Sequence, residues 1–141
     1  MTAVARRRGE TYTHDVEIDS GHTLVIDEPP EAGGAGEGPS PTRTVAASLA
    51  ACTAITVEMY AGRKGWDLGA IEVEADVEWG EKASIRSFTV TLRIPRPLDD
   101  DQQRRLLEIA SRCPVHRALS SETEVAIEDR IEQVDADERA T

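Results

Sequence analysis

The alternation of apolar and polar residues along the chain predicts two β-hairpins. Residues 10–18 and 22–27 alternate with the period of a strand and are separated by Asp-Ser-Gly, a sequence typical of turns. Residues 71–79 and 85–94 form a second and clearer pair. The side chains expected to face the core in this second pair are Ile71, Val73, Ala75, Val77, Trp79, Phe88, Val90, Leu92 and Ile94. A weaker alternation over residues 123–134 predicts a last strand.

One long helix is predicted between the two hairpins, over residues 41–64. Ser40 is a favourable N-cap, Pro41 suits the first helical position, and Gly65 is typical of a helix end. Residues 44–57 contain no charged side chain, so we expect this helix to be buried on nearly all sides. A chain of 141 residues is too short to surround such a helix alone, which favours a dimer.

Two shorter helices are predicted after the second hairpin. Asp99 and the two aspartates that follow it suit a helix N-terminus, because they can cap it and interact favourably with its dipole. The apolar stripe of this helix consists of Leu106, Ile109 and Cys113. Pro114 either ends the helix or begins a further short one that runs to about Ser120.

Length and composition indicate a single acidic domain. We expect the domain over residues 10–134, after a flexible N-terminus (1–9) and before an acidic tail (135–141). A formal charge of -11 argues against a nucleic-acid partner. The sequence has neither the roughly 18 consecutive apolar residues of a membrane span nor the apolar segment of a secretory signal behind its N-terminal arginines. We therefore expect a cytoplasmic protein with no membrane partner.

The two cysteines of the chain, Cys52 and Cys113, are the main candidates for chemistry. In a reducing cytoplasm, paired thiols are more often catalytic than structural. Cys52 lies on the apolar helix, where it could be either a packing residue or a nucleophile. Cys113 is flanked by Arg112, His116 and Arg117. These three side chains could simply face solvent, or, together with the N-terminus of a helix that begins at Pro114, they could favour the Cys113 thiolate.

The sequence makes only a weak case for a metal or nucleotide site. The cysteines and histidines lack the spacings typical of zinc ligands, such as Cys-x-x-Cys. The glycine-rich loop over residues 28–39 contains GGAGEG but lacks the GK[ST] ending of a phosphate-binding loop. We therefore expect neither a metal ion nor a cofactor.

Three motifs resemble, in the same order and spacing, those of the OsmC/Ohr family, the osmotically inducible and organic hydroperoxide resistance proteins. They are DEPPEAGGAGEGPSP at residues 27–41, ASLAACTAITVEMYAGRKGW at 47–66 and CPVHRAL at 113–119. The resemblance extends over most of the chain, roughly residues 10–134. It implies an α+β fold in which two chains intertwine as a homodimer, with antiparallel sheets wrapped around long central helices.

The resemblance also implies a thiol-dependent peroxidase. Cys52 corresponds to the peroxidatic cysteine of this family, and Cys113 to its resolving cysteine. The first thiolate would attack the O–O bond of an organic hydroperoxide, and the resulting sulfenic acid would condense with the second thiol. A dithiol reductant, such as a lipoyl-type dithiol, would then reset the pair.

The chain departs from the family in the residues that activate the peroxidatic thiol. The family has a glutamate just after the Ser-Pro or Asn-Pro that precedes the helix, whereas Thr42 and Arg43 occupy these positions here. The family also has an arginine near its N-terminal strands, but residues 9–42 contain no lysine or arginine. We expect a substitute cation within about 6 Å of the Cys52 sulfur. The candidates are Arg43, Arg112 and Arg117, with residues 6–8 as a further source.

This departure leaves a second interpretation open. The same dimer could hold a small apolar ligand in a cleft near Cys52 and have weak or no peroxidase activity. Retention of both cysteines favours the enzyme, whereas the missing glutamate and arginine favour the binding protein.

Overall fold

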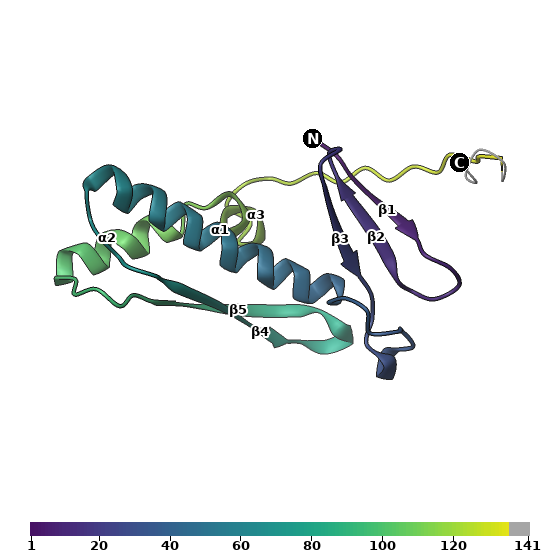
Figure 1. Ribbon diagram of the computed structural model, residues 1–141, viewed down its shortest axis with the longest axis horizontal. Coiled ribbons are helices and arrows are strands. Elements are labelled where there is room, and N and C mark those ends of the chain that lie inside the picture. The colour runs from purple at the N-terminus through teal and green to yellow at the C-terminus, as the bar shows by residue number, and fades with distance from the viewer. Residues whose placement is uncertain (136–141) are drawn as a thin grey trace.

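A computed structural model describes residues 1–135 of the chain. It has the mixed α+β architecture that the sequence predicts (Figure 1). Its elements are β1 (Ala3–Arg7), β2 (His14–Ile18), β3 (His22–Ile26), α1 (Pro41–Lys64), β4 (Glu72–Trp79), β5 (Ile85–Arg93), α2 (Asp100–Ala110) and α3 (Pro114–Leu119), with 3₁₀ turns at Pro30–Ala32 and Glu81–Ala83. The strands form two antiparallel sheets, one in the order β1-β2-β3 and one of β4 and β5.

Both predicted hairpins are confirmed, as β2 with β3 and as β4 with β5. The β4–β5 sheet packs against α1, and the side chains predicted to face the core from this sheet are partly buried, with one exception. Trp79 was expected to face the core but is 49% exposed. The pairing of the strands shifts between Glu78 and Trp79, which breaks the alternation at the end of β4.

The long helix α1 is confirmed, with both ends where the sequence predicts them. Ser40 Oγ accepts a hydrogen bond from the backbone N–H of Arg43 at 3.3 Å, and Pro41 begins the helix. Gly65 ends it in the left-handed region, at φ 71°, which glycine adopts without strain. One face of α1 packs against β4, β5, α2 and α3. The buried residues on this face are Leu49, Thr53, Val57, Tyr60 and Ala61.

The opposite face of α1 is uncovered. Ile55 and Met59 are 56% and 60% exposed, so the expectation that this helix is buried on nearly all sides is wrong for the single chain. The three-stranded sheet stands beyond the N-terminal end of α1 and leaves this face open (Figure 1). By length and composition α1 could cross a membrane, but central helices of soluble proteins share these properties.

The N-terminal residues form a strand instead of the flexible segment expected over 1–9. Strand β1 pairs with β2 along its whole length, from Ala3 opposite Ile18 to Arg7 opposite His14. An edge strand is held by backbone hydrogen bonds, which do not depend on side-chain polarity, so the three arginines do not prevent it. Arg6 of β1 also forms an ion pair with Glu17 of β2, at 3.2 Å.

The strand predicted over residues 123–134 does not form. A strand needs a neighbour that pairs with its backbone, and no other strand of the described chain pairs with this segment. Its apolar side chains are therefore exposed, with Ile131 91% accessible. The acidic tail expected over 135–141 lies, apart from Asp135, outside the described residues.

The two shorter helices are confirmed. Asp99 caps α2 through its side chain, which accepts the N–H of Gln102 at 2.7 Å, while the Gln102 side chain accepts the N–H of Asp99. The predicted stripe of α2 is buried: Leu106, Ile109 and Cys113 all face the interior. Helix α3 begins at Pro114, and both helices pack along α1. This packing brings the segment that carries Cys113 against the middle of α1.

Candidate functional site

The two thiols lie on elements that pack together. Cys52 is partly buried in the middle of α1, and Cys113 is completely buried at the residue before α3. The Cys113 sulfur is 3.9 Å from the hydroxyl of Thr53, the residue that follows Cys52 on the helix. The Cys52 thiol is close enough to influence the ionisation of Cys113. Both cysteines are unbridged, so the structure describes the dithiol state.

Burial raises the pKa of the Cys113 thiol, and its interaction with the Cys52 thiol raises that pKa further. Two hydrogen bonds oppose this effect. The Cys113 sulfur caps α3 by accepting the backbone N–H of His116 at 3.2 Å, and the Thr53 hydroxyl also lowers the pKa. The helix terminus therefore lowers the pKa of Cys113 as expected, but burial raises this pKa by more. The interpretation that the surroundings of Cys113 favour its thiolate is wrong.

The flanking arginines do not offset this burial. Arg112 and Arg117 are exposed, and neither is among the main causes of the shifted pKa. Arg43 is also exposed, and its backbone N–H, not its guanidinium, serves the cap of α1. Within residues 1–135, none of these three guanidinium groups has a hydrogen bond or an ion pair. Their part in activating Cys52 stays a prediction.

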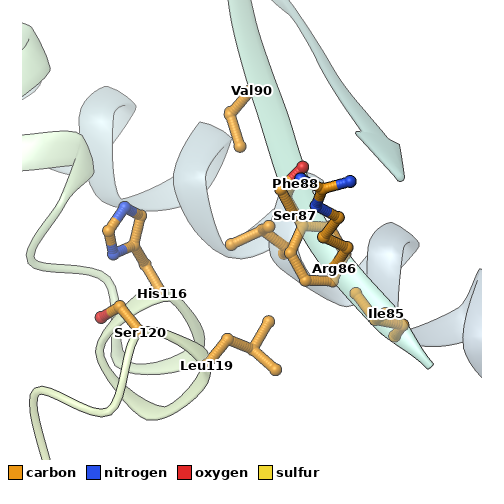
Figure 2. A pocket seen from close by; sticks show the side chains of 9 residues that line it. Ile85, Arg86, Ser87, Phe88, Val90, His116, Leu119 and Ser120 are labelled. Atoms are coloured by element: carbon orange, nitrogen blue, oxygen red, sulfur yellow. The ribbon is translucent and has the colours of Figure 1, made fainter. Parts of the chain in front are cut away.

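A cavity of about 370 Å³ lies between α1, β5 and α3. Its lining is Leu49, Ile85, Arg86, Ser87, Phe88, Val90, His116, Leu119 and Ser120. Figure 2 shows the α3 side chains His116, Leu119 and Ser120 on one side of the hollow and the β5 side chains on the other. Neither cysteine lines this cavity, but Leu49, which does, lies three residues before Cys52 on α1.

The sequence did not indicate the β5 side of this cavity. The alternation predicts Phe88 and Val90 as core residues of a hairpin, and no motif singles out Arg86. No local signal distinguishes a strand residue that lines a cavity from one that fills a core, because the difference depends on what packs opposite. His116 was a candidate, and the structure brings its ring to the cavity wall.

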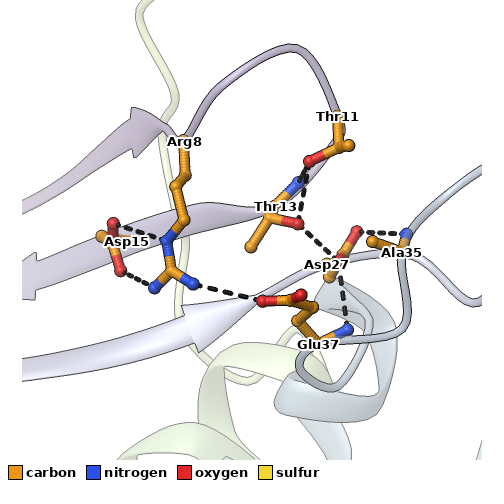
Figure 3. A network of polar contacts seen from close by, with 7 residues as sticks. All are labelled: Arg8, Thr11, Thr13, Asp15, Asp27, Ala35 and Glu37. Carbon is orange, nitrogen blue, oxygen red and sulfur yellow. Dashed lines mark hydrogen bonds and ion pairs between the residues drawn. The ribbon is translucent and has the colours of Figure 1, made fainter.

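A cluster of polar side chains around Asp27, here called the Asp27 cluster, holds the glycine-rich loop in place (Figure 3). The carboxylate of Asp27 is buried and accepts hydrogen bonds from the Thr13 hydroxyl at 2.7 Å and from the backbone N–H groups of Glu28, Ala35 and Glu37 at 2.7, 3.4 and 3.1 Å. Burial alone would raise the pKa of this carboxyl, but the four donors hold it at about 2. Asp27 thus fixes the loop that leads into α1.

Arg8 is attached to the same cluster. Its guanidinium forms an ion pair with Asp15, which lowers the pKa of that carboxyl, and a second one with Glu37 at 3.3 Å (Figure 3). The expected flexible N-terminus therefore contains an arginine fixed between β2 and the loop. Sequence alone could not find this position, because it depends on the pairing of β1 with β2.

The sequence profile of the family described as OsmC-like protein matches residues 34–128. Among solved structures, a protein of Psychrobacter arcticus 273-4, described as a putative osmotic stress induced and detoxification response protein, is 22% identical with a TM-score of 0.76, over 84% of this chain and 87% of its own. The organic hydroperoxide resistance protein OhrB of Bacillus subtilis is 24% identical with a TM-score of 0.58, over 84% and 90%.

A third structure comes from Vibrio cholerae O1 biovar eltor and has captopril bound in one of its active sites. That protein, described as a putative organic hydroperoxide resistance protein, is 25% identical with a TM-score of 0.60, over 84% of both chains. No functionally curated protein matches the sequence.

Proposed function

The chain belongs to the OsmC-like family of soluble proteins, and from this membership and the geometry of its thiols we propose that it reduces organic hydroperoxides in a two-cysteine cycle. Cys52 is the attacking thiol and Cys113 the resolving thiol. The observation that carries the proposal is the contact of Cys113 with Thr53, because it holds the second sulfur against the helical turn of the first. Relatives described as hydroperoxide resistance proteins share the fold.

The cycle needs one thiolate at a time. The Cys52 thiolate attacks the terminal oxygen of the hydroperoxide, so that an S–O bond forms, the O–O bond breaks and an alkoxide leaves as the alcohol after taking up a proton. Cys113 then attacks the sulfenic sulfur, which forms the disulfide and releases water. A cytoplasmic dithiol, such as a lipoyl-type dithiol, reduces this disulfide by exchange.

The cavity beside Cys52 accepts the organic part of the hydroperoxide. Its walls are mainly apolar, from Leu49, Phe88, Val90 and Leu119, which suits an alkyl or aryl group. The relative from Vibrio cholerae, which holds captopril in one of its active sites, is consistent with a site of this family that admits a small organic molecule.

The working form is a homodimer. The open face of α1 carries Ile55 and Met59, and within residues 1–135 no helix packs extensively on the three-stranded sheet. A second copy would cover both surfaces, and its β1–β2 turn would supply Arg8 as a cation for the site. Arg8 suits this role because Asp15 and Glu37 already fix its guanidinium.

A peroxide assay tests the proposal. With tert-butyl hydroperoxide and dihydrolipoamide, the parent protein should consume peroxide, and Cys52→Ser should abolish this consumption. After one equivalent of peroxide, the intact mass of the parent should fall by two hydrogen atoms, while Cys113→Ser should gain one oxygen atom. Ser48→Ala, at an exposed position of the same helix, is the control and should behave as the parent. A parent with no activity that depends on Cys52 would refute the enzyme.

A second candidate function is a dimer that binds a small apolar ligand without turning it over. The raised pKa of Cys113 and the exposed, unpaired side chains of Arg43, Arg112 and Arg117 among the described residues favour it, because none of these three guanidinium groups offsets the burial of the thiol. Binding of an alkyl alcohol that is unchanged in Cys52→Ser, together with an inactive parent, would select this function.

A further inference from the structure

His116 contributes both its backbone and its side chain to the region around the thiols. Its backbone N–H donates to the Cys113 sulfur, and its imidazole lines the cavity (Figure 2). The ring nitrogen Nδ1 is buried and has no hydrogen-bond partner among the residues that the structure describes. Buried polar atoms are nearly always paired, so an unpaired one calls for a partner that binds there.

The other polar groups of the cavity wall are already engaged. Arg86 forms an ion pair with Glu78 at 3.6 Å, and the Ser87 hydroxyl donates to the same carboxylate at 3.4 Å. The Ser120 hydroxyl donates to the backbone carbonyl of Arg117 at 3.3 Å. Among the lining groups, the imidazole of His116 is the one with a buried ring nitrogen that lacks a partner within the described residues, and imidazoles exchange protons readily near neutral pH.

We propose that His116 is the proton donor to the alcohol that leaves when the hydroperoxide is cleaved. This inference rests on the proposed peroxidase function. As the Cys52 thiolate forms the S–O bond, the electron pair of the O–O bond passes to the alkoxide oxygen. The protonated imidazole gives its Nδ1 proton to that oxygen and becomes neutral, and it then regains a proton from water. The unpaired Nδ1 thus finds its partner in the bound peroxide.

A proton donor matters only when the leaving group is basic. tert-Butyl hydroperoxide expels a strongly basic alkoxide, whereas peracetic acid expels acetate, which needs no proton. We expect His116→Asn and His116→Gln to slow the single-turnover oxidation of Cys52 by tert-butyl hydroperoxide by about 100-fold, the usual magnitude of general acid catalysis. Oxidation by peracetic acid should stay within about twofold of the parent. Loss of free thiol in a stopped-flow experiment measures both rates.

The ratio of the two rates in the same protein sample separates catalysis from folding. A variant that folds poorly loses both rates equally, and an equal loss in both variants would overturn the role of His116 as proton donor. Unchanged rates with both oxidants would overturn it as well. Ser48→Ala, at an exposed position of α1 outside the cavity lining, should keep the parental ratio. If the parent reacts with neither oxidant through Cys52, the proposed function fails first, and this inference fails with it.

Discussion

Cys113 is at once the cap of α3 and the proposed resolving thiol, and these two roles are linked. As a cap, its sulfur accepts the N–H of His116, which satisfies one of the free donors at the start of the helix. The same sulfur also contacts the hydroxyl of Thr53, the residue that follows Cys52 on α1. Burial raises the pKa of this thiol and so disfavours its thiolate, which suits the thiol that reacts second in the proposed cycle.

The pH dependence of stability tests the structural role of Asp27 in the Asp27 cluster. Because the pKa of its carboxyl in the folded protein is about 2, below the ordinary 3.8, the carboxylate stabilises the fold above about pH 4 and this contribution is lost as the pH falls toward 2. Asp27→Asn should therefore lower the thermal midpoint by several degrees at pH 7, and the difference from the parent should shrink as the pH falls from 5 to 3.

Thermal melts at pH 7, 5, 4 and 3 would measure this difference. Asp76→Asn is the matched control and should melt with the parent at each pH, because this exposed β4 carboxylate has no side-chain hydrogen bond or ion pair within residues 1–135. A difference between Asp27→Asn and the parent that stays constant down to pH 3 would contradict the structural role of the carboxylate.

The loop between β3 and α1 shows how an element without regular structure is specified. It folds back on itself so tightly that a Cβ atom on Gly34 would lie 1.9 Å from the carbonyl oxygen of Glu28. The same approach brings the backbone N–H groups of the loop to Asp27. Glycine is therefore required at 34 for space, and its conformational freedom is secondary there.

Gly34→Ala should lower the free energy of unfolding by about 2 kcal/mol or more, because the clash forces the loop away from the buried carboxylate. Gly21→Ala lies in the turn between β2 and β3, where an added Cβ meets no atom within 4 Å. It should change stability by no more than about 0.5 kcal/mol. Urea denaturation at one fixed protein concentration compares the two variants, and equal stabilities would show that the loop yields without cost.

The whole molecule exposes apolar side chains in three places. It leaves apolar residues open on α1, on the three-stranded sheet and on the segment after α3, where Ile127 and Ile131 are exposed. Exposed apolar surface of this extent marks an interface. The proposed dimer accounts for all three surfaces at once, because a second copy can cover the helix face and give the last segment a strand to pair with.

Light scattering at micromolar concentration should give about twice the chain mass of 15.4 kDa. Placing lysine at both Ile55 and Met59 should shift this mass toward the monomer, because the interface would have to bury two charges. Thr89→Lys adds a charge on an exposed position of β5 and should leave the mass unchanged. A parent that scatters as a monomer would contradict the dimer.

The sequence by itself determined the elements and their ends. The caps of α1 and α2, the two hairpins and the start of α3 at Pro114 follow from side-chain period, turn residues and capping groups, which act within a few residues of each other. The motifs also identified Cys52 and Cys113 as the thiols of interest. These signals come from residues close together in the sequence, so they can be recognised without knowledge of the tertiary contacts.

The tertiary structure decided the properties that depend on distant segments. It made β1 a strand by pairing it with β2, built the cavity wall from β5, and buried Cys113 so deeply that its pKa rises despite three basic neighbours in sequence. The pKa of a thiol depends on which atoms replace water around it, and the exposure of a helix face depends on how many layers cover it. Both are set by contacts between residues far apart in the chain, which no local pattern encodes.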